Sequence, residues 1–384
     1  MTRIVSPTPS SPHSFREEGG EAPATRYPRR MTRPGLTICI CTHDRPEDVR
    51  ACLAGLAAQS VPTGGLDILV IDSGSPPASA TALAVLVVSH PGARLIRLDA
   101  PGLSAARNAG AAAAAAPWIA YLDDDAVPAP DWAEAALAAI ATAGAGPGPP
   151  PGLIGGRVLP AWEAPLPSWW PPRLRGVLSI VEHEGQGAYG TPELPAGLEP
   201  CGANMLVHGP ALRTVGGFSL AIGRRGAALL SDEEVHLARR LRDAGHLPRY
   251  DSRLVVHHRI RAARLTPAWL LSRLRWQGVS AVRTRLLLGE AGSVWREVPR
   301  RAAVATLYAP AVLACGGPGT RLIGARWRFA YALGFLSEAA AAAGAWVRRG
   351  MTPAGATGGA TAGATGGAHD GTAAAAGRWR RAQG

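Results

Sequence analysis

Three carboxylates stand side by side in YLDDDAVP, residues 121–128, directly after a hydrophobic run. Asp123, Asp124 and Asp125 repel one another, so a ligand or a partner that gathers them is expected. In an extended segment, Asp123 and Asp125 point to one face and Asp124 to the other. Two carboxylates on one face can hold Mg²⁺ or Mn²⁺, which prefer oxygen ligands. A charged turn is the alternative interpretation of an isolated Asp triplet.

Two more polar clusters, THD (42–44) and DSGS (72–75), also follow hydrophobic runs. Asp72 suits a hydrogen-bond acceptor for a nucleobase, and its alternative is an Asx-turn that ends a strand. Asp44 is either a ligand contact or the N-cap of the following helix. Arg107 lies early in an Ala-rich segment, where a cation opposes the helix dipole, so an anionic partner such as a diphosphate is expected. An ordinary surface Arg is its alternative.

A second acidic cluster, SDEEVHLARRL, begins at Ser231. One of its carboxylates, Glu234 before the others, could act as a general base that takes a proton from an attacking hydroxyl. The alternative is a capping box between Ser231 and Glu234 at a helix start. His257 and His258 follow a strand-like run and point to opposite faces of it, so at most one would complete a metal site.

The elements that must position these residues are four short apolar runs separated by helical patterns. Alternating strands and helices predict an α/β fold with a mostly parallel sheet. Ligands of such sheets bind beyond the carboxyl ends of the strands, where the polar clusters fall. The predicted strands are residues 36–41, 66–72, 93–99 and 117–123.

Two intervening helices carry local signals. Residues 49–56 have an amphipathic stripe, with Asp44 and Glu47 as a capping box and Pro46 in the first turn. Residues 104–116 are nearly all Ala, a strong helix former. Further helices are expected near 231–244 and 267–288.

The composition excludes few classes of protein. The chain has 384 residues, a formal net charge of +12 and forty basic residues, all of them Arg. Arg without Lys, beside heavy Ala, Gly and Pro usage, indicates a compositional bias, so the charge is discounted as evidence for nucleic-acid binding. No RNA- or DNA-binding signature is present.

The five Cys suit neither a zinc site nor a disulfide framework. The N-terminus lacks the apolar core of a signal peptide. A cytoplasmic protein with free thiols is therefore expected.

The composition changes along the chain predict its outer boundaries. Residues 1–34 are predicted to be a disordered arm, and residues 351–384 a low-complexity disordered tail. The stretch with Trp162, Trp169 and Trp170 is expected to be an irregular excursion, not a new core. Residues 291–350 are predicted to be a helical extension, made of amphipathic helices that pack on the body or lie on a membrane surface.

Seven segments, taken in order, resemble family-2 glycosyltransferases with the GT-A fold. They are TICICTHDRPEDVRACLAGL, ILVIDSGS, GLSAARNAG, IAYLDDDAVPAPDW, CGANMLVHGPALRTVGGF, EEVHLARRLRDAG and VVHH. The resemblance covers roughly residues 35–285. It implies a GT-A domain over 35–290, with a nucleotide-binding half at 35–145 and an acceptor half at 146–290.

The resemblance also implies roles for single residues. The nucleotide-diphospho-sugar would be contacted by Thr42, Asp44, Asp72, Arg107, Asp123 and Asp124. Asp125 would bind the metal, Mn²⁺ or Mg²⁺, with His258 matching the metal ligand better than His257. The acidic pair Glu233-Glu234 aligns with the family's catalytic carboxylates, with Glu234 as the usual base and Glu233 as the other candidate.

The expected activity is therefore an inverting, metal-assisted transfer of a hexose-like sugar in bacterial polysaccharide or glycoconjugate synthesis. The acceptor would be a saccharide or a lipid-linked saccharide, and no nucleic acid is expected as a partner. The enzyme would be cytoplasmic, with contact to the inner face of a membrane. A non-catalytic nucleotide-binding homologue and a membrane-surface adaptor are the alternatives. A dinucleotide oxidoreductase is disfavoured because THDRPE stands where its glycine-rich turn should be.

Overall fold

The computed structural model describes residues 35–60, 66–144, 149–226, 228–314 and 320–348. The predicted N-terminal arm and C-terminal tail, and Cys315, lie outside these residues. The other four cysteines are free thiols, and Cys39, Cys41 and Cys52 are buried, as expected.

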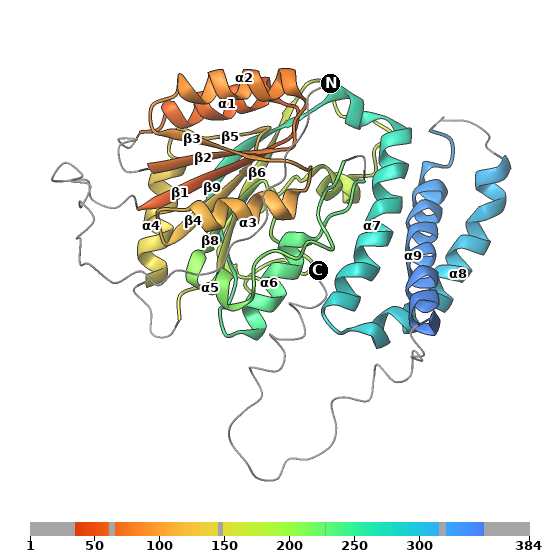
Figure 1. Cartoon of the computed structure of the whole chain (residues 1–384). Coiled ribbons are helices and arrows are strands. Elements are labelled where there is room, and N and C mark those ends of the chain that lie inside the picture. Colours follow the sequence, from red (N-terminus) through yellow and green to blue (C-terminus); the bar gives the residue numbers. More distant parts are fainter. Residues whose placement is uncertain (1–34, 61–65, 145–148, 227, 315–319, 349–384) are drawn as a thin grey trace, which may run out of the picture. The chain divides into compact units, whose positions relative to one another are not determined.

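Four strands form the parallel half of a nine-stranded sheet (Figure 1). They are β1 (Leu36–Thr42), β2 (Leu66–Ser73), β3 (Ala93–Leu98) and β4 (Trp118–Asp123). Their order is β3-β2-β1-β4, and every neighbouring pair is parallel. All four predicted strands and the α/β fold are confirmed.

The other half of the sheet is mixed rather than parallel. β8 (Asn204–His208) pairs antiparallel with β4 and with β6 (Leu153–Trp162), and β6 pairs parallel with β9 (Arg249–Ile260). The short strands β5 (Ala126–Pro128) and β7 (Gln186–Ala188) both pair antiparallel with β9. The expectation of a mostly parallel sheet therefore holds for the first four strands, but the sheet as a whole is mixed, with β6–β9 as the one parallel pair described in its other half.

Both faces of the sheet are buried, which explains why its strands are nearly continuous apolar runs. Alternate residues of β1 enter different clusters: Ile38 and Ile40 face one core, whereas Cys39 and Cys41 face the other. The first core is completed by helices α1 (Pro46–Ala57), α2 (Pro77–Val88) and α4 (Trp132–Gly144). The second is completed by α3 (Leu103–Ala113), α5 (Gly209–Thr214) and α6 (Glu233–Asp243).

The predicted capping boxes are wrong at both helices. The N-cap of α1 is Arg45, and that of α6 is Asp232, and neither side chain caps its helix. Asp44 has a positive φ of 58° and lies before the helix, where its backbone N–H donates to Ser75 Oγ at 2.8 Å. Pro46 does occupy the first turn, as predicted. Because no cap binds it, the start of α6 keeps its carboxylates available for other contacts.

The Trp-rich stretch forms a core of its own, contrary to the expectation of an irregular excursion. Trp170 is buried with Leu178 and Ile260 in a third apolar cluster, and Trp162 and Trp169 pack against it. This cluster lies over the 3₁₀ turns η2 (Pro172–Leu178) and η3 (Ala262–Leu265) and the start of α7 (Pro267–Leu287).

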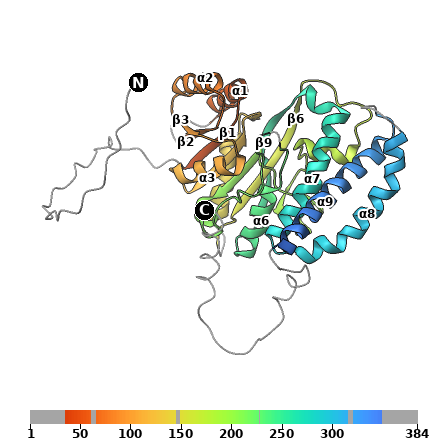
Figure 2. The same ribbon diagram turned by 45° about the vertical axis from the view of Figure 1, so that its right-hand side comes forward.

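The expected C-terminal helical extension consists of α8 (Ala291–Ala314) and α9 (Ile323–Arg348), which lie beside α7 (Figure 2). The backbones of α7 and α9 touch at two glycines. A Cβ on Gly334 would lie 1.9 Å from the carbonyl oxygen of Arg275, and one on Gly278 would lie 2.3 Å from that of Tyr331. Within the described residues, α9 alone is long and apolar enough to cross a membrane.

Candidate active site

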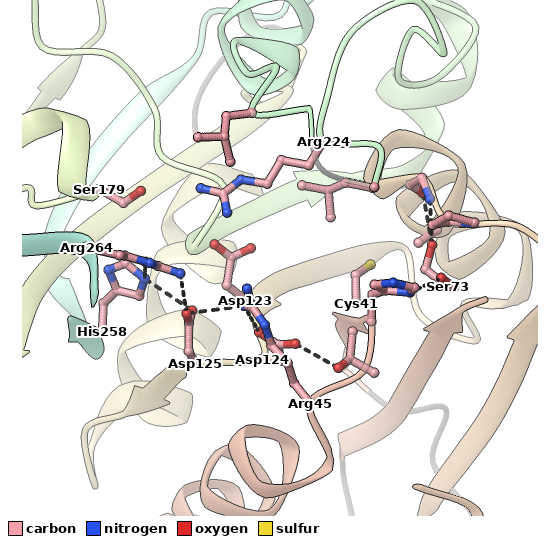
Figure 3. A pocket seen from close by; sticks show the side chains of 18 residues that line it. Cys41, Arg45, Ser73, Asp123, Asp124, Asp125, Ser179, Arg224, His258 and Arg264 are labelled. Carbon is pink, nitrogen blue, oxygen red and sulfur yellow. Dashed lines mark hydrogen bonds and ion pairs between the residues drawn. The ribbon is translucent and has the colours of Figure 1, made fainter. Parts of the chain in front are cut away.

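A pocket of about 220 Å³ opens at the carboxyl ends of β1, β2 and β4 (Figure 3). The strand register sets Thr42 opposite Asp72 and Cys41 opposite Asp123, so the three polar clusters follow neighbouring strands. The mixed half of the sheet and the elements after it supply the opposite wall. The polar lining consists of Thr42, His43, Arg45, Ser73, Asp123, Asp124, Asp125, Ser179, Arg224, His258 and Arg264.

The Asp triplet does not alternate between two faces, because the chain turns at Asp124 and Asp125 between β4 and β5. All three carboxylates line the pocket. One guanidinium gathers two of them: Arg45 Nη1 lies 3.2 Å from Asp124 Oδ1 and 3.5 Å from Asp125 Oδ2. The prediction that Asp124 faces away from Asp123 and Asp125 is therefore wrong. Arg45 is one of the groups that offset the repulsion between the carboxylates.

Asp124 binds a proton more readily than its neighbour Asp125. It is 4 % exposed, and its Oδ2 accepts a hydrogen bond of 2.7 Å from the Thr42 hydroxyl. Burial, followed by the negative charge of Asp125, raises the pKa of Asp124, and Arg45 and Thr42 offset only part of that rise.

Asp125 has the opposite electrostatic environment. Its Oδ1 lies 3.1 Å from His258 Nε2, and its Oδ2 lies 3.0 Å from Arg264 Nη2. Burial alone would raise its pKa, but the hydrogen bond with His258 and the charges of His258, Arg264 and Arg45 hold the pKa of Asp125 below its usual range. These contacts favour the charged form of Asp125.

The carboxylate of Asp125 and the imidazole of His258 are ligands that suit a divalent cation. His258 Nε2 also lies 3.3 Å from Arg264 Nη1, and its Nδ1 is buried without a partner. When Nε2 is unprotonated, it accepts a hydrogen bond from Arg264 Nη1. Its lone pair and the Asp125 oxygen then lie side by side, as two ligands of one cation do. The described residues contain no group of three His, Cys, Asp or Glu side chains arranged around one ion. Substrate oxygens and water would have to complete the shell, which is how Mg²⁺ is commonly bound.

The two adjacent histidines separate as predicted. His258 is buried and lines the pocket, whereas His257 is exposed on the other face of β9. His257 is thereby excluded as a ligand in this pocket.

Arg107 is buried at 2 % exposure and links the end of β4 to the start of α6. Its Nη1 lies 2.7 Å from Glu233 Oε1 on α6, and its Nη2 lies 3.6 Å from Asp123 Oδ1 at the end of β4. These two carboxylates are the anionic partners expected for a cation near the start of α3. Arg107 is therefore not a surface Arg. The acidic cluster of α6 is thereby held next to the Asp triplet.

Glu234 has the properties of a proton acceptor. Its Oε2 is buried without a hydrogen-bond partner among the described residues. Burial and the negative charge of Glu233 raise the pKa of Glu234 to about 8, although Arg107 opposes the rise. Glu233 is engaged by Arg107 through Oε1, whereas its Oε2, like Glu234 Oε2, is buried without a partner among the described residues.

Asp72 and Asp44 do not line the pocket. Asp72 is fully buried; it accepts from the Ser75 N–H at 3.0 Å, and Arg97 Nη1 pairs with it at 3.2 Å. Its carboxylate therefore closes the turn after β2. Asp44 accepts a hydrogen bond from the Ser79 hydroxyl, which links the loop after β1 to the first turn of α2.

The sequence patterns missed three arginines of the pocket: Arg45, Arg224 and Arg264. Arg45 directly follows the THD cluster, so its position was a usable signal. Arg264 comes six residues after His258 and Arg224 lies in a loop, and neither spacing matches a motif. In a chain whose basic residues are all Arg, no single Arg stands out by its type.

Residues 37–170 match the model of "Glycosyl transferase family 2". This part of the chain is therefore similar to the proteins of that family. The matched region holds the Asp triplet and the strands that carry it, while Glu233, Glu234 and His258 lie beyond it.

Two curated proteins of Haloferax volcanii are similar to this chain. A glucosyl-dolichyl phosphate glucuronosyltransferase is 27 % identical over 181 residues, which cover 47 % of this chain and 54 % of that protein. The glycosyltransferase AglE is 26 % identical over 110 residues, which cover 28 % and 36 % respectively. The chain thus spans about half or less of the length of these relatives.

Among solved structures, a mannosyltransferase from Pyrobaculum calidifontis, in complex with GDP-Man and Mn²⁺, is similar at 19 % identity and a TM-score of 0.45. The likeness covers 88 % of this chain and 81 % of that one.

Proposed function

We propose that the chain transfers a sugar from a nucleotide-diphospho-sugar to an acceptor hydroxyl with inversion at the anomeric carbon. The observation that carries the proposal is the Arg107 bridge. It ties the carboxylate at the end of β4, which lies inside the region that matches the glycosyl transferase family 2 model, to the acidic start of α6, which lies beyond that region. A pocket lined with acids and arginines thus lies next to a separate carboxylate with a raised pKa.

The donor is proposed to bind at the carboxyl ends of the parallel strands. Thr42, Asp123 and Asp124 face the pocket and are available to ribose and sugar hydroxyls. Asp72 and Asp44 are proposed to act by fixing the loops after β2 and β1, because their carboxylates are already engaged. Arg107 likewise positions Asp123 and Glu233 in this proposal.

Glu234 is the proposed base. It accepts the proton of the acceptor hydroxyl while that oxygen forms a bond to the anomeric carbon. The bond from the anomeric carbon to the β-phosphate oxygen breaks, and its electron pair leaves with the nucleoside diphosphate. One base and no covalent intermediate suffice for inversion, as in inverting glycosidases.

Asp125 and His258 are the proposed ligands of Mn²⁺ or Mg²⁺. A bound divalent cation would neutralise charge that develops on the leaving diphosphate. Asp125 suits this role because it lines the pocket and its Oδ1 lies 3.1 Å from His258 Nε2.

A saccharide or lipid-linked saccharide is the proposed acceptor, in glycoconjugate synthesis at the cytoplasmic face of a membrane. The name of the glucuronosyltransferase relative, which specifies a dolichyl phosphate substrate, supports a lipid-linked acceptor. The apolar length of α9 supports contact with a membrane.

A thermal-shift screen of nucleotide-sugars, with and without Mn²⁺, tests this function. Ligands that bind only the folded protein raise Tm in proportion to the logarithm of their concentration above Kd. At least one nucleotide-sugar should stabilise the protein, and more strongly with the metal. If no nucleotide-sugar shifts Tm under either condition, the proposal is wrong.

A further inference from the structure

The loop between α5 and α6 fixes an arginine over the pocket. The Leu103 N–H donates to Arg224 O at 3.0 Å, and the Ser104 hydroxyl donates to Ile222 O at 2.7 Å. Gly223 has a φ of +94°, and a Cβ there would lie 2.5 Å from Ser104 Oγ, so the loop sits closely on the start of α3. The backbone of Arg224 is thereby held in place, and its side chain reaches into the pocket (Figure 3).

Arg224 differs from the other arginines of the site in its lack of a partner. Arg45 and Arg264 pair with the Asp triplet, and Arg107 pairs with Glu233. The structure gives Arg224 no ion pair and no side-chain hydrogen bond with any residue in the described ranges. A fixed, half-buried guanidinium without an acceptor favours an anionic ligand.

A second arginine without a partner lies close by on α7. The Nε and Nη1 atoms of Arg273 are buried, and no described residue accepts a hydrogen bond from them. Burial, followed by the positive charge of Arg224, lowers the pKa of Arg273. Burial also lowers the pKa of Arg264, and Arg224 contributes to that shift. Arg224 therefore repels both Arg264 and Arg273, and an added anion would relieve that repulsion.

We propose that Arg224 and Arg273 bind the diphosphate of the donor, on the side of the pocket that faces the C-terminal half of the chain. The two side chains come from the α5–α6 loop and from α7, and they supply donors that the Asp triplet lacks. Planar guanidinium groups match phosphate oxygens in geometry and charge. Arg264 adds charge but is largely committed to Asp125.

This assignment rests on the proposed function and gives it a second source of charge neutralisation. The leaving oxygen carries the electron pair of the broken glycosidic bond, and fixed guanidinium donors stabilise that charge without rearranging. The metal ligands and these arginines would then contact the diphosphate from different elements of the fold.

Paired variants test the assignment. Arg224→Gln and Arg273→Gln remove one charge each, and the exposed neighbours Arg225→Gln and Arg275→Gln are the matched controls. Titration calorimetry of the full chain would measure the affinity for UDP, GDP and dTDP, and for the corresponding nucleosides. Loss of a charge-assisted contact should weaken binding of the diphosphate about ten- to a hundredfold. Nucleoside affinity and the affinities of the control variants should not change.

The outcomes separate the two proposals. If the wild type binds none of the nucleotides, the proposed function itself fails. If the wild type binds a nucleotide and both test variants bind it as tightly as their controls, the arginine assignment is overturned while the proposed function stands. Circular dichroism and Tm establish that each variant is folded before its affinity is compared.

Discussion

Arg107 Nη1 and Glu233 Oε1 lie 2.7 Å apart, and both residues are almost completely buried. Arg107 belongs to α3 and Glu233 to α6, and the two residues are 126 positions apart in the chain. Removing one member of a buried pair leaves an uncompensated charge, and that loss exceeds the modest value of an exposed pair.

Arg107→Gln should therefore lower the free energy of unfolding by about 3–5 kcal/mol. Arg50→Gln, which breaks an exposed pair with Glu47, should cost at most about 1 kcal/mol. Urea unfolding of both variants measures the difference. Similar losses for the two would contradict a buried charge bridge between α3 and α6.

Glu234→Gln should abolish sugar transfer and leave nucleotide affinity nearly intact, because the amide keeps the shape but cannot accept the proton. A loss of about a hundredfold or more in kcat is expected. Asp243→Asn, on the exposed part of the same helix, is the control and should retain activity. If Glu234→Gln keeps full kcat, the base must be sought elsewhere, first at Glu233.

The pH profile of the reaction provides an independent test of the same residue. The base must be unprotonated, and burial together with Glu233 raises the pKa of Glu234 to about 8. The value of kcat/KM should therefore fall as pH falls below about 8, by about tenfold per unit. A rate that is flat from about pH 6 to 9 would be incompatible with a base of this pKa.

Asp125→Asn should remove the dependence of nucleotide-sugar binding on Mn²⁺ or Mg²⁺, since a neutral amide is a poor ligand for either ion. It also leaves Arg264 without its carboxylate, so Tm should fall as well. Calorimetric titration with each metal, and with a chelator, measures the first effect. Unchanged metal dependence in a folded variant would exclude Asp125 as a ligand.

Gly334→Ala should destabilise the packing of α9 on α7, because its Cβ would lie 1.9 Å from the carbonyl oxygen of Arg275. A cost of about 1–3 kcal/mol is expected for such overpacking. Gly344→Ala, on the same helix, meets nothing closer than the end of Arg348 at 3.4 Å. The control should be neutral or stabilising by up to about 1 kcal/mol, because Ala favours helix over Gly. Equal effects in denaturant unfolding would show that α7 and α9 do not touch there.

Local pattern was enough to predict the strands, the α/β fold and the polar clusters at the strand ends. β1 to β4 are apolar runs because both faces of the sheet are buried, and their following residues necessarily meet at one edge. The separation of His257 from His258 followed from strand geometry alone. These inferences depend on near neighbours in the chain, which a sequence records directly.

Long-range partners could not be predicted in the same way. The Asp72 carboxylate was expected to be free to accept a hydrogen bond from a nucleobase. Instead it pairs with Arg97 and accepts a hydrogen bond from the Ser75 N–H. The triplet was expected to be split, but the turn after β4 and Arg45 bring its last two carboxylates together. The capping boxes do not form because Asp44 and Asp232 adopt positive φ and bond elsewhere, Asp44 to Ser75 and Asp232 to Gln277 of α7. Each of these outcomes depends on which side chain from a distant part of the sequence forms the contact. The spacing of residues along the chain does not identify that side chain.

Arg264 reaches Asp125 from 139 residues further along the chain. A chain emerging from the ribosome therefore exposes its Asp triplet long before the cation that helps to neutralise it has been synthesised. Contacts that close such long loops form slowly, since the entropy of closure is lost before the contact is gained. The pocket is consequently completed at the end of folding, and a truncated chain would carry the acidic sequence without the environment that gives it a function.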